Sequence, residues 1–532
     1  MKRILFLSAP ALLLLAFGLP GTPDIRKTYA ETITAANLKT HLSVIASDEY
    51  EGRETAKKGQ KMAAMYIAAR FREFGIPALP GRENDTSLSA YFQDVPLLSK
   101  QAGNGSVKDG TQEYIFGKDF YYTPGIEDGD LQTQDIVFAG YGIQDSLYRD
   151  YDNIDVKGKT ILVLPDEPRD KKGNSLITGK KELSSWSTQR RRKLNEAKDR
   201  GAKAMFIVVP DFRSSYESNK HHIESPTLEL FDEMMVSVVT ARVQVLYISS
   251  EMADALLKNG KTNKTIQALS GRIGKKKKPA SFVFSLPLSV SVNRVGQVIH
   301  SENVLGYLEG SDLKNELVVI TAHYDHLGKV GDVVFNGADD DGTGTVSVIE
   351  MAQAFSKAKK EGHGPRRSIL FMTVTGEEKG LLGSDWYTRH PVFPLAQTVC
   401  DLNIDMIGRV DKDHAKDTNY VYVIGSDRLS SELKRINEES NARYTGLTLD
   451  YRFDAPDEPN SFYTRSDHYN FAKNGIPVAF FFNGVHADYH KETDEVQKIM
   501  FPLMERRARL VFYTAWEIAM RDKRLVVDKK KK

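Results

Sequence analysis

Strand-like and helical segments alternate along the chain from about residue 295 onward, and this pattern constrains the fold more than any other feature. The apolar, strand-like runs are residues 317–322, 368–375, 398–406, 420–424 and 477–482, and the helical runs are 346–355 and 504–520. Parallel strands need a crossover segment between them, and a helix is its usual form. The sequence therefore predicts an α/β fold with a mixed, largely parallel sheet and helices on both faces.

Side chains able to bind metals or transfer protons lie at or after the expected ends of these strands, and one more lies in the loop before the helical run 346–355. They are His323, Asp325, Glu377, Glu378, Asp405, Tyr489 and His490 at the strand ends, and Asp340 in the loop. The carboxyl ends of parallel strands share one edge of the sheet, where ligands of open α/β folds bind, so we expect these residues to converge. Imidazoles and carboxylates together favour zinc, with Co²⁺ or Mn²⁺ as alternatives.

The adjacent pair Glu377-Glu378 is the most informative detail of this pattern, because it directly follows an apolar strand. Paired glutamates more often lie on exposed helices. Successive side chains of extended backbone point in opposite directions. One glutamate of the pair can then bind a metal ion while its neighbour reaches a reacting water molecule.

The aspartate-rich loop 337–342 has a second interpretation. Asp339, Asp341, Thr343 and Glu350 lie near the spacing of an EF-hand calcium loop. An EF-hand also requires a helix before the loop, and residues 331–337 are typical of β or irregular structure. Calcium binding is therefore the less favoured alternative for this loop.

Composition sets the broad class of the protein. At about 100–200 residues per domain, 532 residues suggest two or three domains. The formal net charge of +2 and the lack of a basic stripe give no reason to expect a nucleic-acid partner. Residues 523–532 form a basic tail that we interpret as solvated. The oligomeric state cannot be predicted from these features.

The N-terminus predicts export. Lys2 and Arg3 precede an almost wholly apolar run over residues 4–17, the pattern of a secretory signal. We assign residues 1–30 to this signal, with cleavage within 21–30. The run is shorter than the ~20 residues of a membrane helix, so no stable membrane insertion is expected after its removal; an uncleaved anchor is the alternative. Cys400 is the one cysteine, which suits a bacterial periplasmic or secreted protein without disulfides.

Five motifs in order along the chain resemble those of the M28 family of zinc aminopeptidases and carboxypeptidases. They are HYDH at His323, GADDDGTG at Gly337, TGEEKGLLGS at Thr375, NIDMIG at Asn403 and YHKETDE at Tyr489. The segment SDEYEGR at residues 47–53 adds to the resemblance. The resemblance spans nearly the whole mature chain and implies the zinc aminopeptidase/phosphorylase-like fold.

A separate, β-rich region is similar to the protease-associated (PA) insert of many family members. The matching segments are VFAGYGI at Val137, VKGKTILVL at Val156 and GAKAMFIVV at Gly201. We therefore divide the mature chain into the N-terminal part of the peptidase domain (31–130), a PA insert (131–285) and the catalytic domain (295–522). The insert is expected to shape access to the cleft and to carry no catalytic residue.

The resemblance also implies a role for each site residue. His323, Asp340 and Asp405 would hold one ion, and Asp340, Glu378 and His490 a second, with Asp340 bridging the two. Glu377 would be the general base, Asp325 would orient His323, and Tyr489 would donate a hydrogen bond to the oxyanion.

We therefore expect an exported exopeptidase with two Zn²⁺ ions that removes N-terminal amino acids from peptides with a free N-terminus. Three alternatives stay open. A carboxypeptidase acting on acidic dipeptides would need converging arginines, for which Arg409, Arg452 and Arg465 are candidates. A glutaminyl cyclase would use one zinc, and a non-catalytic binding protein would have lost ligands that this chain retains.

Overall fold

The computed structural model describes residues 24–529 except 102–104, 124–127, 233–242 and 293. Most of the predicted signal, residues 1–23, lies outside this described part. Its last residues belong to the short helix α1 (Ile25–Ala30). Asp24 caps this helix, and its side chain accepts a hydrogen bond from the Arg26 backbone N–H. Tyr29 and Ala30 at the end of α1 are buried in a hydrophobic core.

The chain forms two compact units, residues 1–95 with 301–532 and residues 96–300. Each has its own hydrophobic core. The first boundary lies earlier than the predicted boundary at residue 130. The reason is that β2 (Ser106–Lys108) pairs with β10 (Phe282–Val292) and so belongs to the sheet of the second unit.

The sheet of the first unit confirms the predicted α/β fold. Seven of the nine strands in this sheet run in the order β18-β17-β19-β16-β12-β15-β11. They are β11 (Val295–Leu308), β12 (Leu313–His323), β15 (Arg367–Val374), β16 (Thr398–Ile404), β17 (Tyr420–Ile424), β18 (Thr448–Asp450) and β19 (Val478–Phe482). β12 is parallel to both β15 and β16, and β16 is parallel to β19. β11 and β17 join antiparallel, so the sheet is mixed and largely parallel.

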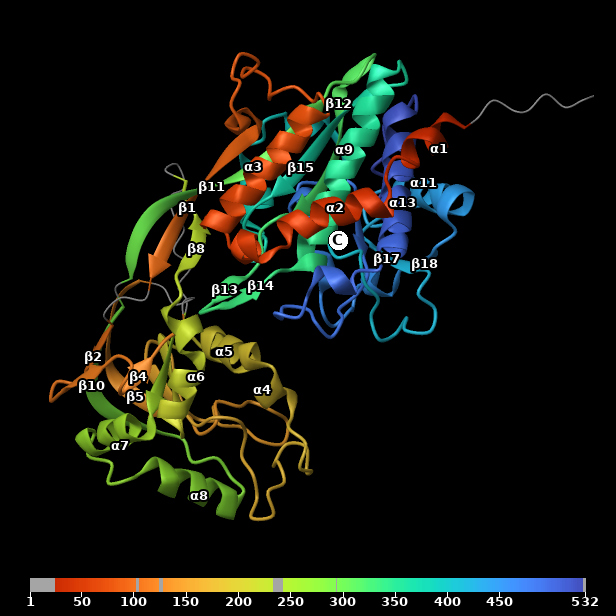
Figure 1. Cartoon of the computed structure of the whole chain (residues 1–532). Helices are drawn as coiled ribbons and strands as arrows, with labels where there is room; N and C mark the ends of the chain where they lie inside the picture. Colours follow the sequence, from red (N-terminus) through yellow and green to blue (C-terminus); the bar gives the residue numbers. More distant parts are fainter. Residues whose placement is uncertain (1–23, 102–104, 124–127, 233–242, 293, 530–532) are drawn as a thin grey trace, which may run out of the picture. The chain divides into compact units, whose positions relative to one another are not determined.

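Helices cover both faces of this sheet, and Figure 1 labels those of one face, among them α3 (Lys58–Glu73) and α9 (Gly344–Lys360). Val318 and Ile320 of β12 lie in one core with α1, α2 (Ala35–Ile45), α3, α9, α11 (Ser431–Ser440) and α13 (Phe501–Met520). Leu317 and Val319 lie in a second core with α10 (Leu382–Arg389) and α12 (His468–Ala472). Successive strand residues point to opposite faces, so an unbroken apolar strand supplies both cores.

The second unit contains an eight-stranded sheet in the order β3-β2-β10-β5-β6-β7-β9-β4. The further strands are β3 (Glu113–Ile115), β4 (Phe120–Tyr121), β5 (Gly129–Phe138), β6 (Thr160–Val163), β7 (Ala204–Val209) and β9 (Gln244–Ser249). Its helices are α4 (Ser185–Thr188), α5 (Arg190–Asp199), α6 (Phe212–Glu224), α7 (Ser250–Asn259) and α8 (Ile266–Lys276). The assignment of this unit as a PA insert stays a prediction.

None of the helices in the described part of the chain is long and apolar enough to cross a membrane.

Candidate metal centre

Three neighbouring parallel strands bring the predicted site residues to one edge of the first unit's sheet. β12 ends at His323, and β16 ends one residue before Asp405. β15 ends at Val374, three residues before Glu377. Asp340 precedes α9 in the loop that leads away from the same edge. The convergence expected from strand order is therefore present.

The five predicted ligands form a continuous chain of contacts. His323 Nε2 lies 3.3 Å from Asp340 Oδ1 and 3.7 Å from Asp405 Oδ1. His490 Nε2 lies 3.1 Å from Asp340 Oδ2 and 3.2 Å from Glu378 Oε2. The two oxygens of Asp340 thus face two different histidines, which is the arrangement that a bridging carboxylate requires.

The chemistry of these atoms fits metal binding. His323 Nε2, Asp340 Oδ2 and Glu378 Oε1 are buried and have no hydrogen-bond partner among the described residues. Buried polar atoms nearly always have a partner, since an unpaired one costs about 1–3 kcal/mol. Two ligands that each lie about 2.0–2.2 Å from one zinc ion are about 3–4 Å apart, and the donor separations of 3.1–3.7 Å match this spacing.

The adjacent glutamates occupy different electrostatic environments. Burial raises the pKa of Glu377 well above its usual value, and the neighbouring charges of Glu378 and Asp405 raise it further. Burial also opposes the charge of Glu378, but the imidazoles of His326 and His490 outweigh it and lower the pKa of Glu378 to about 2. The Glu377 carboxylate lies 3.9 Å from His323 Nε2, beside the ligands.

The resemblance implies that Asp325 orients His323, and in the structure the backbone of Asp325, rather than its carboxylate, lies next to the His323 ring. The His323 Nδ1 atom lies 3.0 Å from the backbone carbonyl oxygen of Asp325 and 3.9 Å from its carboxylate. The carboxylate instead accepts hydrogen bonds from the Thr55 hydroxyl at 2.7 Å and the Glu377 backbone N–H at 3.2 Å. Asp325 therefore contacts both the predicted ligand His323 and the backbone of the predicted base.

Tyr489 stands at a small cleft beside the ligands. The cleft has a volume of about 30 Å³ and is lined by Asp340, Glu377, Asp405, Met406, Phe462, Arg465, Phe480, Phe482, Val485 and Tyr489. The Tyr489 hydroxyl accepts a hydrogen bond from Arg465 at 3.3 Å. Burial raises the pKa of Tyr489, so the phenol keeps its proton and can donate it in a hydrogen bond.

Asp339 and Asp341 have structural roles that sequence reasoning did not identify. Asp341 accepts hydrogen bonds from the backbone N–H groups of His323, Gly344 and Met406 at 2.9–3.2 Å. Asp339 accepts from the Gly408 N–H at 2.7 Å and contacts His486 at 3.2 Å. Three consecutive aspartates look alike in sequence, and only their surroundings in the structure distinguish the predicted ligand Asp340 from its two neighbours, although Asp341 also lies in a group with His323 and Asp405 that could hold a metal ion.

Arg53, from the SDEYEGR segment, is a second residue whose role was not anticipated. Its fully buried guanidinium donates to the backbone oxygens of Tyr324 at 2.8 Å, Asn336 at 2.7 Å and Gly337 at 2.9 Å, and also to that of Ile45. Tyr324 and Gly337 flank the ligands His323 and Asp340 in sequence, so Arg53 holds both ligand-bearing segments.

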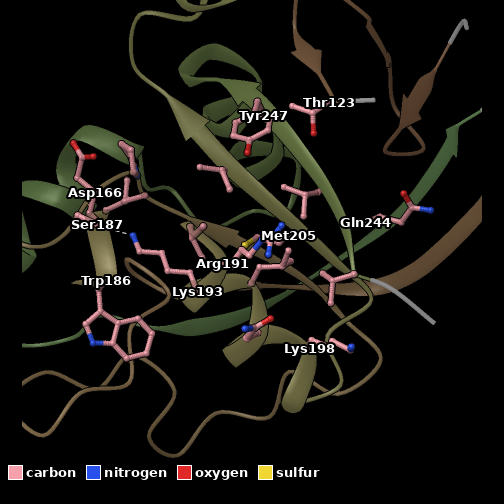
Figure 2. Close-up of a pocket in the computed structure, with 18 residues that line it drawn as sticks. Thr123, Asp166, Trp186, Ser187, Arg191, Lys193, Lys198, Met205, Gln244 and Tyr247 are labelled. Atoms are coloured by element: carbon pink, nitrogen blue, oxygen red, sulfur yellow. Dashed lines mark hydrogen bonds between the residues drawn. The ribbon is translucent and has the colours of Figure 1, made fainter. Parts of the chain in front are cut away.

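The second unit has a cavity of a different character (Figure 2), with a volume of about 770 Å³. Lys193 points across it and donates a hydrogen bond to the Asp166 carbonyl oxygen, and burial lowers the pKa of Lys193 to about 8. Asp166 is the one acid, and histidine is absent, among the described residues that line the cavity. It therefore lacks the donor set found in the first unit.

Comparisons with known proteins agree with this site. Residues 303–515 match the model of Peptidase family M28, a range that contains every predicted ligand. Aminopeptidase YwaD of Bacillus subtilis is 27% identical over 43% of this chain and 47% of its own length. A probable zinc metalloprotease of Pyrenophora teres is 27% identical over 43% of this chain and 53% of its own length. The chain thus spans about half the length of these curated relatives.

A solved structure extends the likeness of fold to nearly the full chain. The aminopeptidase from Aneurinibacillus sp. strain AM-1 aligns with a TM-score of 0.53 at 18% identity, covering 95% of this chain and 98% of that one. The edge of the sheet gathers histidines and carboxylates that could hold a metal ion, and one relative is named a probable zinc metalloprotease. Residues 303–515 thus match peptidase family M28, which confirms the resemblance seen in the motifs of this part of the chain.

Proposed function

We propose that the protein is an exported aminopeptidase that uses two zinc ions to remove N-terminal residues from peptides. The observation that carries the proposal is the shared carboxylate of Asp340, whose two oxygens face His323 and His490. Asp405 completes the ligands on the His323 side, and Glu378 completes them on the His490 side. Ions in such a pair polarise a scissile carbonyl group and activate a water molecule.

The protein's own side chains supply the proton transfers. Glu377 lies beside the ligands and lines the cleft, so that it can take a proton from the attacking water and pass it to the leaving amine. Tyr489 lines the same cleft and offers a hydrogen bond to the negative charge that develops on the carbonyl oxygen. Adjacent Glu378 is a ligand in this scheme, because its two oxygens lie near His326 and His490.

The lining of the cleft supports an aminopeptidase. Asp340 and Asp405 are among its lining residues, and their carboxylates suit the α-ammonium group of a peptide. Phe462, Phe480 and Phe482 also line the cleft and make it partly apolar. Acidic and apolar groups side by side suit the first residue of a peptide, whose α-ammonium group and side chain are adjacent.

The arginines do not favour a carboxypeptidase. Arg409 pairs with Asp488 at 2.8 Å, and Arg452 pairs with Asp450 at 2.7 Å. Of the three candidates, Arg465 alone lines the cleft. The retention of every ligand and of Glu377 likewise gives no support to a non-catalytic binding protein.

Export rests on the N-terminal pattern, with a periplasmic or secreted location. Tyr29 and Ala30 are buried in the core, and Asp24 accepts hydrogen bonds from Tyr444 at 2.7 Å and Arg443 at 3.0 Å. Cleavage within residues 21–23 would keep these contacts, whereas cleavage at residue 30 would remove them. We therefore place the cleavage point at the start of the 21–30 window.

The test is turnover of a panel of aminoacyl-nitroanilides and peptides, each with a free or a blocked N-terminus, by the zinc-loaded protein. We expect hydrolysis of the free substrates, loss of activity with a chelator and no cleavage of blocked substrates. A Glu377→Ala protein purified in parallel controls for contaminating peptidases. Equal cleavage of blocked and free peptides would exclude an aminopeptidase, and no hydrolysis of either kind would exclude a peptidase.

A further inference from the structure

His326 is a buried histidine that the ligand set described above does not use. It lies three residues after His323 and is 0% exposed. Its backbone N–H donates to the Arg53 carbonyl oxygen at 3.1 Å. Its ring packs against Gly337, where an added Cβ would come within 2.4 Å of His326 Cγ. The ring position is therefore set by the backbone on two sides.

The ring faces the two carboxylates that also face His490. His326 Nδ1 lies 2.9 Å from Glu378 Oε1 and 3.9 Å from Asp340 Oδ2. Despite the short distance, neither Nδ1 nor Glu378 Oε1 has an aligned hydrogen bond with any described residue. Nitrogen and oxygen atoms that lie close together without being aimed at each other are typical of donors that point at a common cation.

A buried imidazole without partners does not by itself indicate a metal ligand. His468 is also fully buried, and both its ring nitrogens lack a hydrogen-bond partner among the described residues. It stacks on Phe480 with ring centroids 4.7 Å apart, and no carboxylate of the described residues lies within 4.0 Å of its nitrogens. His326 differs from His468 because carboxylates face its ring nitrogen, whereas both rings are equally buried.

We propose that His326 Nδ1 is a further ligand to the ion held by Asp340, Glu378 and His490, an assignment that rests on the proposed two-metal function. Donor atoms of His326, Asp340 and Glu378 lie within 4.8 Å of one another. This ion then has two imidazoles and two carboxylates, whereas the ion at His323 has one imidazole and two carboxylates. The four-donor site holds zinc more tightly, so it loses its ion last during chelation.

The test is a crystal structure of the zinc-loaded, full-length protein, combined with zinc affinities from chelator competition. We expect a distance of about 2.0–2.1 Å between zinc and His326 Nδ1. We expect His326→Gln to lower the affinity of one zinc site by ~100-fold or more, beyond the 10–100-fold typical of a neighbour that merely supports a ligand. His468→Gln, which also removes a buried imidazole, should keep both affinities.

Different outcomes would overturn the assignment of His326 and the proposed two-metal function. Two bound zinc ions with His326 Nδ1 more than about 3 Å from either would overturn the assignment of His326 and leave the proposed function intact. Uptake of fewer than two zinc ions by the wild-type protein would instead overturn the two-metal function. The more conservative His326→Asn variant, with circular dichroism of both metal-free variants, separates loss of a ligand from loss of the fold.

Discussion

At the scale of single residues, residues adjacent in sequence have different roles at this site. Asp340 faces two histidines, whereas Asp341 beside it binds backbone N–H groups of three segments. Glu378 faces two imidazoles, whereas Glu377 faces the cleft. Local backbone direction decides each role, so two adjacent residues of the same type can act differently.

Glu377→Ala should abolish most turnover without loss of metal. Removing a general base typically costs about 10²–10⁴-fold in rate. The Glu377 carboxylate lies farther from His323 Nε2, at 3.9 Å, than those of Asp340 and Asp405 do, so its removal should leave the metal in place. The measurement is kcat on a free aminoacyl-nitroanilide, together with the zinc content of the same sample. A near-normal kcat would remove Glu377 from the role of base, and loss of zinc would make it a ligand.

Much of the site could be predicted because its chemistry lies at strand ends, where sequence order gives spatial order. His323, Asp405 and Glu377 follow apolar runs that the structure shows as β12, β16 and β15. The supporting contacts could not be predicted, because they depend on backbone N–H and carbonyl groups that every residue carries. Asp341 and Arg53 act on such groups, so their residue types alone gave no signal.

At the scale of elements, a short N-terminal segment supports the loops that bear the ligands. Residues Asp48–Arg53 form a 3₁₀ turn in which Gly52 has φ +64°. A Cβ at Gly52 would come within 2.3 Å of the Gly328 carbonyl oxygen, in the hairpin of β13 (Gly328–Val330) and β14 (Val333–Phe335). This close approach directs the next residue, Arg53, into the space between the two ligand-bearing segments.

Arg53→Met should therefore weaken both the fold and metal binding. The change leaves buried carbonyl groups and acids without their cation, at a cost of about 3–5 kcal/mol, and should lower zinc affinity roughly 10–100-fold. Chemical denaturation of the metal-free protein and chelator competition measure the two effects. Arg53→Lys keeps the charge and should recover part of both.

Arg367→Met is the matched control for this change. Arg367 is also buried and donates to the Ile518 carbonyl oxygen at 2.9 Å, but it lies at the first residue of β15, at the other end of the strand from Glu377. It should cost similar stability and leave zinc affinity unchanged. Equal losses of affinity in both variants would show that Arg53 has no special relation to the metal centre.

At the scale of the whole molecule, the proposed chemistry belongs to one of two separately packed units. The hydrophobic core of the first unit is built from residues before 95 and after 301, and that of the second from residues between 107 and 292. Every candidate ligand lies in the first unit. Because metal binding stabilises only the folded unit that holds the site, the two units should differ in their response to metal.

Calorimetry of the full chain should show two unfolding transitions, of which a chelator lowers one. An ion present at 100 times its Kd contributes about 2.7 kcal/mol, so we expect the metal-dependent Tm to fall by roughly 5 °C or more. Phe371→Ala and Phe206→Ala, each a buried phenylalanine of one core, assign the transitions to the first and second units. A chelator that lowered the transition sensitive to Phe206→Ala, or that lowered neither, would contradict the placement of the metal centre in the first unit alone.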